Sequence, residues 1–218
     1  MTNKEKEKLF YQNIKKLSKA QKWKFKGYFI FKKINDLFFE SNFYINSKTD
    51  KIHGYLAYKP YSVDNTFWEL TEMPENSEMP LSFRADAAFR VSSYDIYKYD
   101  IQIKNVEKPE KEIRALLDTI DKKVELIIAR NLGLEDFLNT LEKKKINPVG
   151  VITCLMELEE YEKALQKIEL YRKTDIRSGY NFEGRDFYDL IEKYCNKKMG
   201  INNVIMKIGS RINKIFKH

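Results

Sequence analysis

The 218-residue sequence is poor in the residues on which several protein classes depend. It has two cysteines, two histidines and eight glycines, and its apolar runs are at most four residues long. Because a helix needs about 20 apolar residues to cross a bilayer, we predict no membrane span. No apolar stretch follows the charged residues 1–10, which predicts no secretory signal and a cytoplasmic location. Cys154 and Cys195 are 41 residues apart in helix-like sequence, which favours buried reduced thiols over a disulfide.

Motifs that carry enzyme chemistry are also missing. The sequence has no Gly-x-Gly-x-x-Gly, no phosphate-binding Gly-x-x-x-x-Gly-Lys-Ser/Thr and no Gly-x-Ser-x-Gly. His53 and His218 have no neighbouring ligand at metal-site spacing, and the cysteines form no Cys-x-x-Cys pair. We therefore predict a protein without catalytic residues, metal or cofactor.

One group of polar residues fits a nuclease pattern. Restriction-like nucleases place an acid on one strand and a Glu/Gln-x-Lys pair on the next, and Asp86 with Gln102 and Lys104 resembles this arrangement. Metal-dependent cleavage would require Asp86 and Gln102 at adjacent strand ends. The alternative is that Gln102 and Lys104 form the solvent face of a strand.

The net charge of +8 is unevenly distributed along the chain. Residues 1–33 hold eleven lysines against two glutamates, and residues 193–218 hold seven basic residues and no acid. Residues 34–192 carry 22 basic and 30 acidic side chains, a net charge of −8. Such segregation allows a basic partner to dock on the acidic middle of the chain, and the alternative is a solvated surface.

The most acidic stretch, residues 61–83, has five acids and no Lys or Arg. We predict that it approaches a basic protein partner through six residues: Asp64, Trp68, Glu69, Glu72, Glu75 and Glu78. The alternative interpretations are a solvated acidic loop and, for the tryptophan, an ordinary core position. Two prolines and an Asn-Ser pair in residues 73–80 place much of this stretch on a loop.

Hydrophobic periodicity divides the chain near residue 107. Residues 3–19 have apolar positions at helical spacing, which predicts an amphipathic helix on a sheet. Strands are predicted at 24–46 with a turn at 35–36, then at 52–58, 82–91 and 94–106. In the last strand, apolar and polar residues alternate, as in an antiparallel sheet with one wet face.

From Pro109 onward the period is helical. Helices are predicted at 109–128, 134–145, 148–158, 160–173, 183–197 and 201–216. The run Leu155–Tyr171 resembles one tetratricopeptide-type helical hairpin, without a second copy. The predicted fold class is therefore α+β: residues 1–107 form an antiparallel sheet with an N-terminal helix, and residues 108–218 form an array of five or six short helices.

The basic ends have several interpretations. Six lysines between residues 15 and 26, interleaved with Trp23 and Phe25, predict either a nucleic-acid stripe with a stacking aromatic or a solvated helix face. The predicted helix over 201–216 has an isoleucine face that an anionic membrane surface, a partner groove or the chain's own array could accept.

The aromatic blocks Trp23–Phe31, Leu37–Phe39, Leu56–Pro60, Asp64–Trp68 and Pro80–Ala85 resemble those of small bacterial proteins, some of which lie among immunity genes of toxin systems. In general character the chain also resembles immunity proteins of contact-dependent growth inhibition and of polymorphic toxins. The resemblance covers about the first 105 residues. It implies a protein that neutralises a toxin by binding it, and it assigns no binding residue.

Two function hypotheses result. The first is a non-enzymatic protein-binding module, most plausibly a toxin-neutralising immunity protein whose partner is a basic toxin domain. The second is a nucleic-acid-associated protein that binds through its Lys-rich termini, with a divergent restriction-like nuclease as its enzymatic form.

Overall fold

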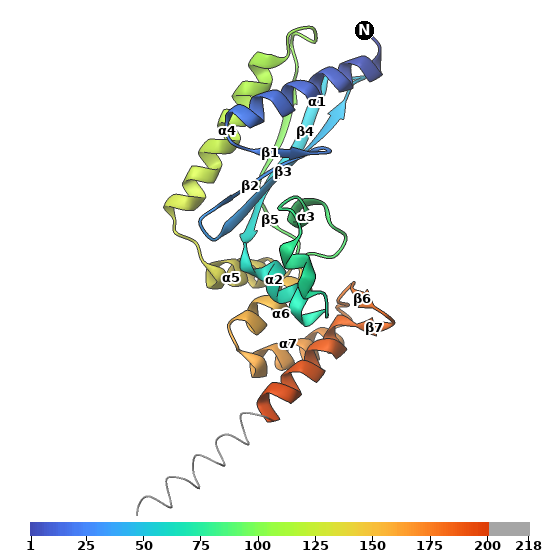
Figure 1. Cartoon of the computed structure of the whole chain (residues 1–218), viewed down its shortest axis with the longest axis vertical. Helices are drawn as coiled ribbons and strands as arrows, with labels where there is room; N and C mark the ends of the chain where they lie inside the picture. The colour runs from blue at the N-terminus through green and yellow to red at the C-terminus, as the bar shows by residue number, and fades with distance from the viewer. Residues whose placement is uncertain (201–218) are drawn as a thin grey trace, which may run out of the picture.

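The computed structural model describes residues 1–200; the helix predicted over 201–216 lies outside them. Helix α1 (Asn3–Ala20) is followed by five strands and two further groups of helices (Figure 1). The strands are β1 (Lys24–Lys26), β2 (Phe29–Ile34), β3 (Leu37–Asn46), β4 (Lys51–Pro60) and β5 (Tyr94–Gln102). They form one antiparallel sheet in chain order, so the predicted α+β class is confirmed.

One face of the sheet is covered by α1 and α4 (Glu110–Ala129), which contact each other. Helix α1 begins at a capping box, in which Thr2 and Glu5 satisfy each other's main-chain N–H groups. Its buried residues Phe10, Ile14 and Leu17 recur at helical spacing and join the strand side chains in a common core. The predicted amphipathic helix on a sheet is therefore confirmed.

Strand β4 approaches its neighbours closely at Gly54. A Cβ atom at this position would lie 2.0 Å from the main-chain oxygen of Asn42 and 2.7 Å from the Tyr99 hydroxyl. The Tyr99 hydroxyl donates to that same Asn42 oxygen and lies 3.0 Å from Ser41 Oγ. Only glycine leaves room for this cross-strand contact.

Residues 61–93 cover part of the opposite face. This segment contains α2 (Ser62–Leu70), the 3₁₀ helix η1 (Pro74–Glu78) and α3 (Phe83–Asp86). The strand predicted over 82–91 is wrong, because these residues form α3 and then an irregular stretch. Tertiary contacts decide this conformation: the Arg84 guanidinium lies 3.7 Å from the centre of the Tyr61 ring, and Arg84 Nη1 donates to the Tyr61 carbonyl.

The remaining helices form an array at the lower end of Figure 1. They are α5 (Leu134–Lys144), α6 (Pro148–Glu157), α7 (Tyr161–Lys173) and a helix over 187–200, which follows the hairpin of β6 (Asn181–Phe182) and β7 (Arg185–Asp186). Helix α6 packs on α2, and one hydrophobic core extends from Phe10 to Cys195. Since α4 lies on the sheet, the sheet layer continues beyond the predicted boundary at residue 107.

Cys154 and Cys195 are buried free thiols, as predicted. No helix within residues 1–200 is both long enough and apolar enough to span a bilayer.

Candidate functional site

A buried ion cluster, formed by Lys59, Asp64 and Arg84, lies between β4 and the 61–93 segment. Lys59 Nζ lies 2.9 Å from Asp64 Oδ1 and 2.7 Å from Oδ2, and both side chains are fully buried. Lys59 also donates to the main-chain oxygens of Arg84 and Val91. Asp64 in turn accepts from the Val91 N–H at 2.9 Å. These contacts tie both ends of the segment to the sheet.

Burial changes the pKa of the lysine in the cluster. It lowers the pKa of Lys59 from 10.5 to about 8, although the neighbouring Asp64 carboxylate opposes the shift. Close by, burial raises the pKa of Glu40, despite the Arg90 guanidinium 3.3 Å away. The second Glu40 carboxylate oxygen, Oε2, has no hydrogen-bond partner within residues 1–200. Because these groups are shielded from solvent, we assign them a structural role in holding the segment.

The predicted partner-binding residues separate into two groups. Asp64 and Trp68 are fully buried, and Trp68 Nε1 donates to the Phe89 carbonyl at 2.7 Å. Their assignment to a contact surface is therefore withdrawn, because the helical period of α2 turns them toward the core. Four residues remain exposed, and we call them the acidic surface: Glu69, Glu72, Glu75 and Glu78.

The acidic surface is largely unpaired. Glu72 alone of its four carboxylates forms an ion pair within residues 1–200, with Arg185 at 2.9 Å, and hydrogen bonding to this guanidinium lowers the pKa of Glu72. Behind Glu69 a pocket of about 250 Å³ contains Glu157 and Glu159 as further acids and Lys198 as a counter-charge. The negative potential therefore extends from η1 toward the turn between α6 and α7.

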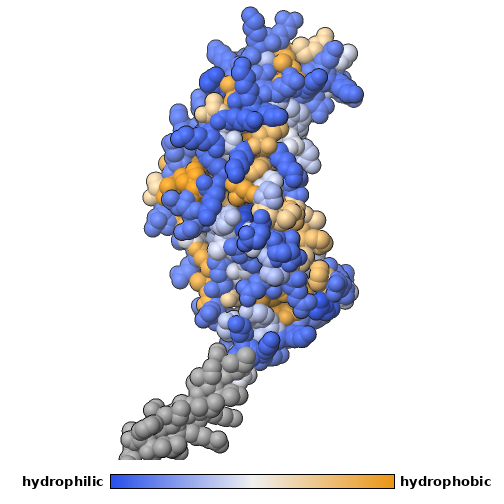
Figure 2. Space-filling view, in the orientation of Figure 1, coloured by the Kyte–Doolittle hydropathy of each residue, from blue (hydrophilic) through white to orange (hydrophobic). Residues whose placement is uncertain are grey.

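Two apolar residues beside the acidic surface escaped the sequence analysis. The side chains of Met79 and Phe89 are 48% and 42% exposed. The Phe89 ring packs edge-on against the Tyr180 ring, with the ring centroids 5.6 Å apart, and this contact holds Phe89 in place. Figure 2 shows paler and orange residues over the segment around α3, whereas hydrophilic residues cover α1. No sequence signal distinguished Phe89, because it fell in a wrongly predicted strand.

Asp86 and Gln102, which resemble residues of a nuclease site, do not come together in the fold. Asp86 lies on α3, 3.9 Å from Lys26 of the edge strand β1. Gln102 ends β5 at the opposite edge of the sheet, where its amide donates to the main chain of Thr49 and Asp50. Asp86 and Gln102 therefore do not meet at adjacent strand ends. Within residues 1–200 no cluster of His, Cys, Asp or Glu could hold a metal ion.

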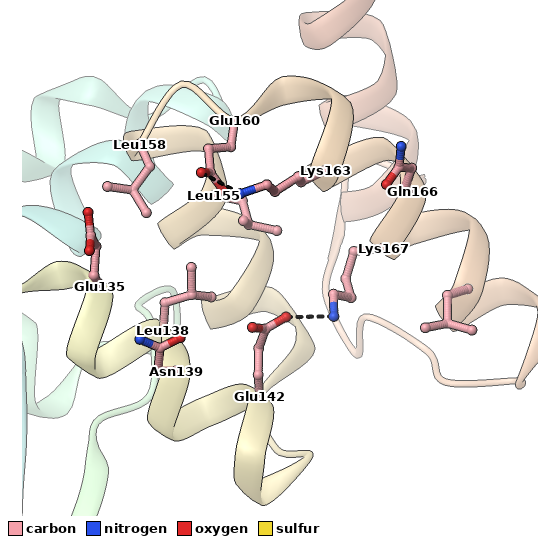
Figure 3. A pocket seen from close by; sticks show the side chains of 11 residues that line it. Glu135, Leu138, Asn139, Glu142, Leu155, Leu158, Glu160, Lys163, Gln166 and Lys167 are labelled. Carbon is pink, nitrogen blue, oxygen red and sulfur yellow. Dashed lines mark hydrogen bonds and ion pairs between the residues drawn. The ribbon is translucent and has the colours of Figure 1, made fainter.

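A groove of about 520 Å³ runs between α5 and α7, with α6 as its floor (Figure 3). Leucine side chains line its base, and two ion pairs lie along it: Glu142 with Lys167 at 2.5 Å and Glu160 with Lys163 at 2.6 Å. These two pairs neutralise four of the charges in the groove, while Glu135, Asn139 and Gln166 also line it without an ion pair among residues 1–200.

The N-terminal lysines point into solvent, but their predicted stacking partner does not. Trp23 is 2% exposed, and its Nε1 donates to Asp121 at 2.9 Å. The predicted stripe therefore lacks its aromatic at this position.

The chain matches no protein-family model, no curated protein and no solved structure.

Proposed function

We propose that this chain is a non-enzymatic protein-binding module that docks a basic partner on its acidic surface. The observation that carries the proposal is the exposure of four carboxylates in a stretch without any Lys or Arg, next to the exposed side chains of Met79 and Phe89. Apolar anchors surrounded by charge are typical of protein interfaces.

The rigidity of this surface supports the proposal. The buried ion cluster and the Trp68 hydrogen bond anchor the 61–93 segment at several points. A surface held in one conformation loses less conformational entropy on binding than a mobile loop does. The three carboxylates without an ion pair within residues 1–200, Glu69, Glu75 and Glu78, would accelerate encounter with a basic partner and disfavour an acidic one.

The biological role that we propose for this binding is toxin neutralisation. The resemblance to immunity proteins implies that the partner is a toxin domain, and a basic toxin such as a nuclease fits the charge of the acidic surface. Neutralisation then needs no chemistry from this chain, since covering the toxin's own site is sufficient.

The experiment compares three forms of the tagged full-length chain, expressed in its native host. They are the wild type, an acidic-surface variant (Glu69→Gln, Glu75→Gln and Glu78→Gln) and a matched control that neutralises three exposed acids elsewhere (Glu107→Gln, Glu125→Gln and Glu162→Gln). Each form is isolated at moderate salt, and bound proteins are identified by mass spectrometry.

We expect the wild type and the control to retain one stoichiometric basic protein that the acidic-surface variant loses. Recovery of that protein by all three forms, or of no protein by the wild type, would refute the proposal. For toxin neutralisation, the captured protein is expressed alone and together with the chain. Growth arrest that the chain relieves supports this role, and arrest that persists contradicts it.

A further inference from the structure

Three aromatic rings form an exposed ladder at one end of the sheet: Tyr28 lies in the turn before β2, Tyr44 on β3 and His53 on β4. The Tyr28 and Tyr44 ring centroids are 6.4 Å apart with planes inclined by 28°, and those of Tyr44 and His53 are 5.5 Å apart and inclined by 25°. Both tyrosines are 47% exposed, and His53 is exposed as well. We call these three residues the ring ladder.

Tyr44 and His53 lie on the sheet face opposite α1 and α4, and Tyr28 stacks on Tyr44 from the turn before β2. Tyr44 pairs with His53 in register, and both alternate with core residues that face the helices. On the same face, the 61–93 segment covers a separate small core formed by four residues: Phe29, Phe31, Phe38 and Ala85. Beyond that core the face is open, so the ladder is the uncovered continuation of a buried aromatic surface.

Three lysines lie on the side of α1 that carries Tyr11, which reaches the end of β3. The Tyr11 hydroxyl donates to the Phe43 carbonyl at 3.0 Å, which places this side of the helix beside the end of β3. Lys4, Lys8 and Lys15 are seven and three residues before and four residues after Tyr11, so they share its side of the helix. All three are exposed, and none has a carboxylate within 4.0 Å in residues 1–200.

Two nearby acids are paired, whereas Glu7, four residues before Tyr11 on α1, is exposed and forms no ion pair within residues 1–200. Asp50 pairs with Lys6 at 2.7 Å, and Asp100 pairs with Lys51 at 3.3 Å. The turn between β3 and β4 adds Lys48, which is exposed and has no ion pair among the described residues. The surroundings of the ring ladder therefore carry a net positive charge, at the end of the sheet away from α2 and η1 (Figure 1).

We propose that the ring ladder and the α1 lysines bind single-stranded nucleic acid. Exposed rings on a sheet accept unpaired bases by stacking, and the lysines contact the phosphates. A duplex hides the faces of its bases, so the ladder selects single strands. This surface replaces Trp23, which is buried, as the stacking partner for the Lys-rich N-terminus.

The test measures fluorescence anisotropy of a labelled 12-nucleotide oligo(dT), and of a duplex of equal length, with the full chain at several salt concentrations. The variants are Tyr28→Ala with Tyr44→Ala, and Tyr28→Phe with Tyr44→Phe, which keeps both rings. Lys4, Lys8 and Lys15 are changed to Gln in a third variant. A charge-matched control changes three exposed lysines on and after α5 to Gln: Lys143, Lys144 and Lys145.

We expect the alanine pair to weaken binding of the single strand by about tenfold or more, and the phenylalanine pair by about twofold at most. The α1 variant should reduce the slope of log affinity against log salt by about 2, since each phosphate contact contributes about 0.7. The control should bind like the wild type. Because all substituted side chains are exposed or on the helix surface, thermal unfolding checks that the variants remain folded.

Three results would overturn the proposal. The first is no binding of the oligonucleotide at low salt, and the second is equal affinity for the duplex. The third is an alanine pair that binds the single strand as tightly as the wild type and the control do. If the oligonucleotide does not bind while the alanine pair abolishes capture of a protein, the ladder is a protein interface instead.

Discussion

Replacing Asp64 by alanine tests the structural role of the buried ion cluster. The substitution removes both oxygens that contact Lys59 Nζ and the acceptor of the Val91 N–H. Breaking a fully buried ion pair leaves an uncompensated charge and costs about 3–5 kcal/mol. For a chain of this size each kcal/mol lowers the melting temperature by about 2–4 °C, so we expect a decrease of roughly 10 °C.

The stability that Asp64→Ala removes should be larger at low pH than at high pH. Since the folded-state pKa of Lys59 is about 8, below the ordinary 10.5, the unfolded chain binds this proton more tightly. Stability from this group therefore rises with pH between about 8 and 10.5. Without the Asp64 carboxylate, the pKa of Lys59 falls further. The free energy of unfolding of the variant therefore begins to rise at a lower pH than that of the wild type. The difference between the two proteins should be larger at pH 6 than at pH 9.

Urea unfolding followed by circular dichroism at both pH values measures this difference. Asp86→Ala is the control, because Asp86 is exposed and its ion pair with Lys26 is long. We expect it to change the free energy of unfolding by at most about 0.5 kcal/mol. A loss below about 1 kcal/mol for Asp64→Ala, or an equal loss at pH 6 and pH 9, would refute the reasoning.

Three further substitutions test other parts of the fold by the same unfolding measurement. Gly54→Ala should destabilise the chain by about 1–3 kcal/mol, because its Cβ collides with the Asn42 main chain, and an unchanged midpoint would contradict that packing. Glu40→Gln should stabilise the chain by roughly 1 kcal/mol at pH 7, where the buried carboxylate has an oxygen without a hydrogen-bond partner within residues 1–200. Because burial raises the pKa of Glu40, folding favours its protonated form, and this gain should disappear below pH 4.5; a gain independent of pH would contradict the assignment. Trp68→Phe should destabilise the chain by about 1–3 kcal/mol by orphaning the Phe89 carbonyl, and an unchanged free energy of unfolding would contradict that hydrogen bond.

The sheet and most helices were predictable because their periods are strong. In β5 the exposed Lys98 and Asp100 alternate with the buried Tyr99, as the sequence pattern requires. The segment from 61 to 93 was harder, because two prolines placed 73–80 on a loop and no helix was predicted over the residues that form α2. Val63, Phe67 and Leu70 are spaced by four and three residues, and this helical signal would have placed Asp64 and Trp68 on the buried side.

Other features depend on contacts between distant residues. Lys59 of β4 contacts main-chain oxygens 25 and 32 positions away, so no local pattern contains the whole ion cluster. The ring ladder was in part readable, because Tyr44 and His53 are out of phase with the apolar residues on either side of them. Tyr28 joins them only through the pairing of β2 with β3, which periodicity does not specify.

The association rate between the chain and its captured protein partner tests the central claim most directly. It is measured by stopped flow at several salt concentrations for the wild type, the acidic-surface variant and the matched control. We predict that the acidic-surface variant associates at least about tenfold more slowly at low salt, that its rate depends less on salt, and that the control matches the wild type. Equal association rates and equal salt dependence for all three proteins would contradict the assignment of partner binding to Glu69, Glu75 and Glu78.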